Sequence, residues 1–232
     1  AKALHDEIKK ITSKPVKLVI NENGQGHAML GNSYWIDLGV PILAHEDAIK
    51  EFEENGTQIL NRMISYNREK ADGTRLVLPT ISFKDKYVIN LGNISIEVLY
   101  LGPAHSPGDI SVWVPSKKLI IAGDMAFHER LLPIFPETNT REWINTWDNK
   151  FEKLNATYVI PGHGHPTNMS QVRRYTRDYL VYIREKIGTF LEKGGELKDA
   201  YYVDQTPFSH LQTFKELATR NAGRVYEEME FE

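Results

Sequence analysis

Three short glycine- or proline-rich turns, each beside an apolar run rich in β-branched residues, constrain the fold of this chain most strongly. Runs of this kind, bounded by such turns, are typical of strands that end at the edge of a sheet. Each turn carries a side chain able to bind a metal: His105 in residues 102–109, Asp124 in 122–124, and His163 in 161–166. Imidazole and carboxylate groups suit zinc or iron. The turns therefore predict one metal-capable site built from distant parts of the chain.

The rest of the chain alternates between helical and strand-like patterns. Apolar residues recur at helical spacing in residues 1–12, 46–70 and most of 168–232, and Asn139 followed by Glu142 predicts the start of a further helix. Short β-branched runs predict strands over residues 16–20, 88–91, 94–101, 110–114, 119–122 and 158–160. We expect an α/β fold in one domain, residues 1–232, with a helical portion at about 169–232.

Composition excludes several classes of function. The chain has 28 Lys and Arg against 31 Asp and Glu, a net charge of −3, and no basic run offers a surface for nucleic acid. No apolar stretch reaches the roughly 20 residues of a membrane span, so we expect no membrane partner. The absence of cysteine removes disulfides, thiolate nucleophiles and thiolate ligands. Composition leaves the cellular compartment open.

In their order and context, the three turns resemble the ligand segments of the metallo-β-lactamase superfamily. The flanks of a fourth segment add to this likeness, since residues 19–21 read Val-Ile-Asn and residues 31–35 read Gly-Asn-Ser-Tyr-Trp. The resemblance implies an αββα metallo-β-lactamase-like sandwich with a hydrolytic site for one or two metals. It also implies that the strands which normally precede the first helix are missing here. We expect a partner, such as a second copy of the chain, to cover the exposed sheet edge.

Between those flanks, the signature Thr-His-x-His-x-Asp-His of the family is altered. The flanks align Glu22 with the threonine, and they align His27 with the aspartate. The three histidines of the signature fall on Asn23, Gln25 and Ala28. The glycine spacers remain. All four ligand positions of this loop are therefore changed, whereas the other three segments keep their side chains.

The resemblance assigns the retained residues to the metal. His105, Asp124 and His163 stand at ligand positions, and Asp124 would also orient the attacking water or move its proton. His27 is a fourth candidate ligand, because imidazole also binds zinc well. One single-metal subclass of the family has Asn at the position of Asn23 and binds its metal through the positions of His27, Asp124 and His163. We therefore predict one zinc ion at most.

Each of these ligands also has a simpler interpretation. His105 could be an ordinary turn residue, and Asp124 could form an Asx-turn or cap a helix. His27 could be a polar loop residue in an abandoned site.

The polar neighbours have weaker claims to a role. Glu22 would act as a general base only if burial raised its pKa, and it is otherwise a solvated loop carboxylate. Asn23 and Gln25 are poor zinc ligands and would at most bind a water or the substrate. His165 is expected to support the site from behind the ligands or to lie on the surface.

Two functions are open on these grounds. One is a metal-dependent hydrolase with a reduced, at most mononuclear site, acting on a small molecule such as a lactam, lactone or thioester. The other is a catalytically inactive, metal-free protein of the same fold, natural or stripped of its site, that serves in binding or assembly. All four changes fall within residues 23–28, which fits either a rebuilt single-metal site or targeted replacement. The hydrolase is the interpretation we favour.

Overall fold

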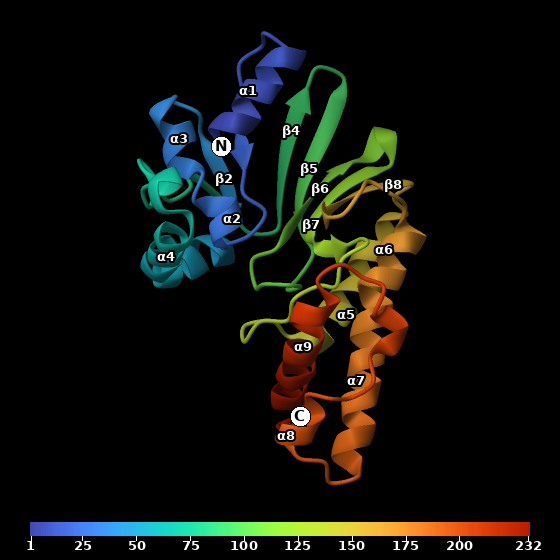
Figure 1. The fold of residues 1–232 in the computed structure, drawn as a ribbon. Coiled ribbons are helices and arrows are strands. Elements are labelled where there is room, and N and C mark those ends of the chain that lie inside the picture. The colour runs from blue at the N-terminus through green and yellow to red at the C-terminus, as the bar shows by residue number, and fades with distance from the viewer. The chain divides into compact units, whose positions relative to one another are not determined.

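The computed structural model describes all residues, 1–232, and they form two compact units, Ala1–Asp85 and Lys86–Glu232. Figure 1 labels the helices and strands of both units. None of the helices combines the length and the apolarity that crossing a membrane requires.

The N-terminal unit combines a small sheet with helices. Its three strands pair in the order β1-β2-β3, and both pairings are parallel. The middle strand β2 is buried along its whole length and leads directly into the longest helix, α4. The elements are α1 (Lys2–Ile11), β1 (Val19–Ile20), α2 (Gly26–Met29), α3 (Asn32–Asp37), β2 (Ile42–His45), α4 (Glu46–Asn67), a 3₁₀ turn (Arg68–Ala71) and β3 (Ile81–Phe83).

His45 joins β2 to α4 and is only 1% exposed. Its Nδ1 accepts a hydrogen bond from Asp47 N at 3.2 Å, so the ring caps the helix. Its Nε2 donates to Lys84 O at 2.7 Å, which requires the proton to be on Nε2. Burial lowers the pKa of His45, because the charged ring would lose its hydration. This side chain is therefore a neutral structural cap.

A five-stranded sheet forms the centre of the C-terminal unit, in the order β4-β5-β6-β7-β8. The strands from β4 to β7 pair antiparallel, and β8 pairs parallel to β7. Because side chains alternate between the faces of a sheet, Leu99, Trp113 and Ile120 lie on one face, which packs into the main core. The strands are β4 (Lys86–Leu91), β5 (Ile94–Tyr100), β6 (Ile110–Val114), β7 (Leu119–Phe127) and β8 (Tyr158–His163).

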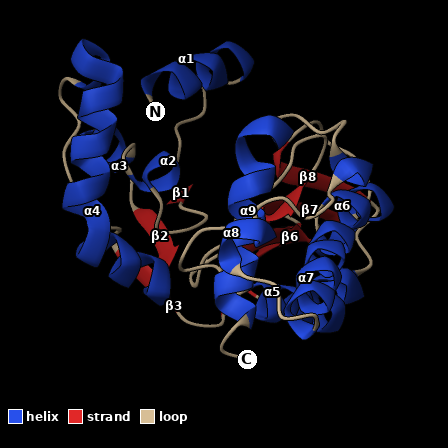
Figure 2. Ribbon diagram, turned by 60° about the horizontal axis from the view of Figure 1, so that its bottom comes forward, coloured by secondary structure: helices blue, strands red, loops and turns tan.

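Helices supply the other half of that core, and Figure 2 shows α5, α6 and α7 grouped beside β6, β7 and β8. Asn139 Oδ1 accepts a hydrogen bond from Glu142 N at 2.8 Å, so the predicted start of α5 is confirmed. Trp143 and Trp147 are both fully buried in this core. The elements are 3₁₀ turns (Pro115–Lys117, Glu152–Leu154, Thr206–Phe208), α5 (Thr140–Thr146), a π-helical turn (Trp147–Phe151), α6 (Met169–Tyr175), α7 (Arg177–Glu192), α8 (Leu197–Ala200) and α9 (Phe214–Met229).

Three strands differ from the sequence prediction by three residues or more. β7 continues to Phe127 and β8 continues to His163, beyond the apolar runs that predicted them. Gly123 has φ +58°, and the pairing of β7 with β8 shifts register on both sides of it. The glycine that the pattern marked as a strand end is therefore an irregularity inside a longer strand. In the N-terminal unit, only Val19 and Ile20 of the predicted first strand find partners in β2.

Candidate metal centre

Asp124 occupies the irregular part of β7 and is 3% exposed. The neighbouring strand comes close at this point. A Cβ atom at Gly162 of β8 would lie 2.5 Å from Asp124 Oδ1 and 2.7 Å from Gly123 O. Glycine at position 162 is therefore required for the carboxylate to sit between the two strands.

The two imidazoles of the C-terminal unit approach this carboxylate from different sides. His105 Nδ1 lies 3.7 Å from Asp124 Oδ2, and His163 Nε2 lies 3.5 Å from Asp124 Oδ1. His105 is buried, with 1% of its side chain exposed, whereas 37% of the His163 side chain is exposed. The structure thus brings together the three residues that follow three separate apolar runs. Solvent reaches the group from the side of His163.

Aromatic rings and backbone contacts hold His105 in place. Its ring lies 5.1 Å from Phe135 and 5.8 Å from Trp143, both edge-on, and 5.9 Å from Phe127. The Thr138 hydroxyl donates a hydrogen bond to His105 O at 2.7 Å. These contacts surround the His105 imidazole with aromatic rings and fix the position of its backbone carbonyl.

The turn that follows His105 is closed by Asp109. Ser106 N donates to Asp109 Oδ2 at 2.6 Å, and the Ser106 hydroxyl donates to Asp109 Oδ1 at 3.0 Å. Both residues are buried. Asp109 therefore stabilises the turn between β5 and β6, a role that the sequence alone had not indicated.

His163 is held by two neighbours from the end of β7 and the segment after it. Phe127 stacks on the imidazole, with ring centroids 5.1 Å apart and an interplanar angle of 24°. Arg130 Nη1 lies 2.8 Å from His163 Nδ1 and 3.4 Å from Nε2. Arg130 was not among the predicted site residues. Its position in the run Phe-His-Glu-Arg, directly after the strand of Asp124, was the available signal.

His165 and Glu129 form a separate pair beside His163. His165 Nδ1 lies 2.6 Å from Glu129 Oε2, and the His165 backbone N–H donates to the same oxygen at 3.3 Å. Hydrogen bonding from His165 holds the pKa of Glu129 below its ordinary value. The His165 side chain is 84% exposed. His165 therefore lies at the surface with Glu129 as its side-chain partner, and a role in supporting the site stays a prediction.

The altered loop of the N-terminal unit has an ordered structure of its own. Asn21 Nδ2 donates to Ala28 O at 2.8 Å, and Asn23 Oδ1 accepts from Gln25 N at 3.1 Å. Asn23 is completely buried. Asn21 and Asn23 thus organise the turn that leads into α2.

The glycine spacers of this loop allow it to pack against α4. A Cβ atom at Gly24 would lie 2.7 Å from Ala48 O, and one at Gly26 would lie 2.6 Å from Ile59 Cγ2. Neither position tolerates a larger residue without a shift of the loop. The spacers are therefore required for packing, whatever the ligand positions contain.

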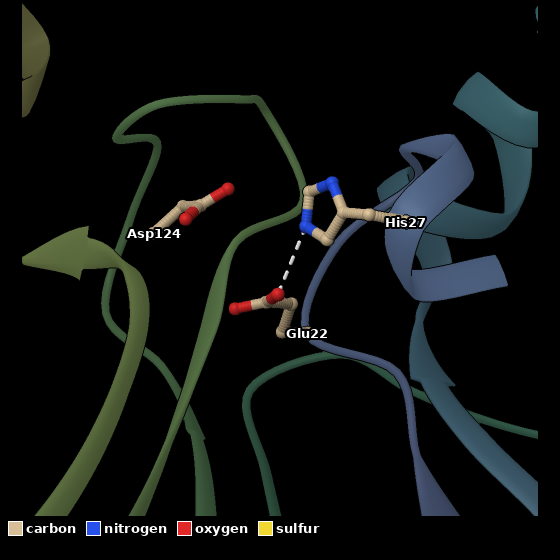
Figure 3. A group of neighbouring side chains, drawn as sticks. All are labelled: Glu22, His27 and Asp124. Atoms are coloured by element: carbon tan, nitrogen blue, oxygen red, sulfur yellow. Dashed lines mark hydrogen bonds and ion pairs between the residues drawn. The ribbon is translucent and has the colours of Figure 1, made fainter. Parts of the chain in front are cut away.

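His27 and Glu22 form a pair within this loop (Figure 3). His27 Nε2 lies 2.9 Å from Glu22 Oε1. The Glu22 side chain is 29% exposed and that of His27 is 45% exposed. Glu22 was expected to be a solvated loop carboxylate or a general base. The structure instead gives it an imidazole partner.

Comparisons with known proteins agree with this fold. The family model described as "Metallo-beta-lactamase superfamily" matches residues 29–163, more than half of the chain. The matched region begins directly after the altered loop and contains His105, Asp124 and His163.

Curated relatives match about half of the chain. The acyl-coenzyme A thioesterase MBLAC2 of Homo sapiens is 27% identical over 119 residues, which cover 49% of this chain and 42% of the relative. A metallo-beta-lactamase type 2 of Bacteroides fragilis is 27% identical over 115 residues, which cover 48% of this chain and 45% of the relative. The chain therefore spans less than half the length of these relatives.

Solved structures share the fold at low sequence identity. A metallo-beta-lactamase from Pontibacter korlensis has a TM-score of 0.64 at 18% identity, covering 78% of this chain and 76% of that one. The sec-alkylsulfatase Pisa1 from Pseudomonas sp. has a TM-score of 0.73 at 17% identity, covering 98% of this chain and 43% of that one. By its sequence match and its αββα-type fold, the chain belongs to the metallo-β-lactamase superfamily.

Proposed function

We propose that this protein is a metal-dependent hydrolase with a single zinc ion. The observation that carries the proposal is the buried Asp124 carboxylate between two imidazoles, 3.7 Å from His105 and 3.5 Å from His163. A structural core has no need for two histidines and a carboxylate at one strand edge, and burying such groups costs free energy unless they are paired or ligate a metal. Its superfamily relatives include hydrolases.

The donor set of the C-terminal unit fits zinc by its chemistry. Two imidazole nitrogens and a carboxylate oxygen are ligand types that catalytic zinc sites use, with three protein ligands and one open position. His105, Asp124 and His163 would hold the ion. Bound zinc would supply polarisation of a substrate carbonyl and a more acidic water.

The protein's own residues would control substrate access, proton transfer and the exclusion of water. His163 has 37% of its side chain exposed, so it lies where a substrate can reach it. Asp124 is positioned to orient the His163 imidazole or to take up a proton from the attacking water. The aromatic rings around His105 exclude water from the buried side of the group, which strengthens its electrostatic interactions.

His27 is an alternative third ligand in place of His105, on the strength of its alignment with the signature aspartate; either set leaves one position open. Its partner Glu22, 2.9 Å away, would then accept a hydrogen bond from the imidazole and fix the orientation of the ring. Asn23 and Gln25 would at most bind a water or the substrate, and the Asn23 side chain also accepts a hydrogen bond from the Gln25 backbone that shapes the loop.

The substrate class we propose is a small acyl compound: a lactam, a lactone or a thioester. Support comes from two similar proteins, one an acyl-coenzyme A thioesterase and the other a metallo-beta-lactamase. All three substrate types present a carbonyl carbon to an attacking water, so one arrangement of His163 and Asp124 serves each of them.

Metal analysis and turnover together test the proposal. Protein purified without added metal is expected to contain about one zinc per chain, and to hydrolyse at least one of a chromogenic lactam, an aliphatic lactone and an acyl thioester. Asp124→Asn and His163→Gln should each lose zinc and lower kcat/KM by about 100-fold or more. His210→Gln is the matched control, because His210 is an exposed histidine of the same unit.

The competing function is a metal-free, inactive member of the fold that acts in binding or assembly. The changes at Asn23, Gln25, His27 and Ala28 favour it. Zinc at background level, together with turnover that is the same in wild type and Asp124→Asn, would establish this function and reject the hydrolase.

A further inference from the structure

Arg130 makes an unusual contact with His163. Its Nη1 atom is within 3.4 Å of both ring nitrogens. Cε1 lies between those nitrogens in the plane of the ring, so an atom in that plane at both distances would overlap Cε1. Nη1 therefore lies out of the ring plane, with an N–H directed at the ring nitrogens.

This out-of-plane position matters because the lone pairs of imidazole nitrogens point outward in the ring plane. Arg130 contacts the ring without lying along either lone-pair direction. Phe127 also stacks on this ring, 5.1 Å away between centroids. Between them, Arg130 and Phe127 restrict how the His163 ring can rotate.

A strap from the C-terminal part of the unit holds the Arg130 segment. Gln212 N donates to Glu129 O at 3.0 Å, and Leu131 N donates to Gln212 O at 2.9 Å, so Arg130 forms a bridge with Gln212. Arg130 Nε donates to Thr213 Oγ1 at 3.4 Å. The residues that position Arg130 thus lie about 80 residues further along the chain, just before α9.

Both sides of this strap contain strained backbone. Glu129 has φ +61° and Thr213 has φ +60°. Positive φ is uncommon for residues other than glycine, and for a β-branched residue such as threonine it is a clear outlier. Such conformations cost about 1–3 kcal/mol each and concentrate at functional sites. Here they occur on the two segments that fix the Arg130 side chain.

We propose that Arg130 is a positioning residue, which orients the His163 ring toward Asp124, and that the strap at residues 212–213 holds Arg130 in place for this purpose. The inference deepens the proposed hydrolase, because it concerns the same site. Its structural part, the orientation of His163, can be measured in metal-free protein. Failure of the metal proposal would therefore leave it testable.

The first experiment records the imidazole resonances of metal-free protein by long-range ¹H–¹⁵N NMR. In Arg130→Gln, the signals of the His163 ring are expected to shift or broaden, because the ring loses its contact with the guanidinium. Arg130→Lys should fall between wild type and Arg130→Gln, since lysine keeps the charge and loses the planar group. Arg173→Gln is the control, as Arg173 pairs with Glu152 and Asp178 in the same unit.

The second experiment measures zinc affinity by competition with a chromophoric chelator. Arg130→Gln is expected to weaken zinc binding about 10-fold or more, the range found for residues that orient metal ligands. Thr213→Val removes the hydroxyl and keeps the shape, so it should show a smaller loss, which Thr213→Ser should not show. The proposal is overturned if His163 resonances and zinc affinity in Arg130→Gln match those of Arg173→Gln.

Discussion

The loop at residues 21–28 and the strand ends around Asp124 are built in opposite ways. In the loop, side chains at former ligand positions serve local structure, as the buried Asn23 does by accepting a bond from Gln25 N. At the strand ends, polar side chains are buried next to one another: His105 and Asp124 are almost fully buried and lie 3.7 Å apart. The buried amide of the loop therefore shapes its own turn, whereas the strand ends gather titratable side chains from distant parts of the chain.

The largest expected effect comes from Gly164, which follows His163. It has φ +93°, and an added Cβ would lie 2.0 Å from His128 O. Gly164→Ala should lower the free energy of unfolding by about 3 kcal/mol or more, because backbone strain adds to a backbone clash. Gly39→Ala is the matched control: Gly39 has φ +72° with nothing within 4 Å, so only about 1 kcal/mol should be lost. Chemical denaturation measures both. Equal losses would show that the strand end tolerates crowding as well as an open turn does.

The loop should respond to loss of Asn23 by a smaller amount. Asn23→Ala removes the acceptor of Gln25 N inside a buried site, and we expect a loss of about 1–2 kcal/mol in unfolding free energy. Asn23→Ser keeps an acceptor oxygen without adding a charge and serves as the control. If Asn23→Ala were as stable as wild type, the side chain would have no structural role, and the contrast between the two regions would weaken.

A pH effect is expected from His45, which lies outside both regions. Its folded pKa is below the ordinary value of 6.5, because burial penalises the charged ring more than Asp47, Glu46 and Asp85 stabilise it. As the pH drops below about 6.5, His45 takes up a proton more readily in the unfolded chain than in the folded one. The free energy of unfolding should therefore fall as the pH drops from this value. Denaturation midpoints between pH 8 and 5 measure this. His45→Gln should flatten the dependence, and an unchanged slope would assign the effect to other groups.

The smallest effect should come from the Glu22–His27 pair. Both side chains are partly exposed, so Glu22→Gln should change the unfolding free energy by about 0.5 kcal/mol or less. A reduced zinc content in the same variant would show that the pair acts on a metal. A large loss of stability would instead make this pair a structural element like Asn23.

Much of the C-terminal site could be predicted from sequence, because strands that end in glycine-rich turns bring distant residues to one sheet edge. This predicted that His105, Asp124 and His163 would meet. The prediction placed Asp124 after its strand, however, because Gly123 resembles a strand end. Only the pairing with β8 shows that β7 continues through it.

Asp109 bonds to Ser106 only three residues earlier, so its role in the turn was open to prediction from the local sequence. Arg130 could not be predicted, because nothing in the local sequence specifies that it contacts a ring 33 residues away. The start of α5 at Asn139 was predictable for the opposite reason, since a cap and its partner are three residues apart.

The bridge between Arg130 and Gln212 ties the segment before α9 to the segment after β7. A truncation before residue 212, or an insertion between α8 and α9, would remove or displace the backbone partner of Glu129 and Leu131. Such a change would therefore shift the backbone next to Arg130 without altering any residue of the strand ends. Engineering of this chain should treat Gln212 and Thr213 as part of the framework that holds Arg130 against His163.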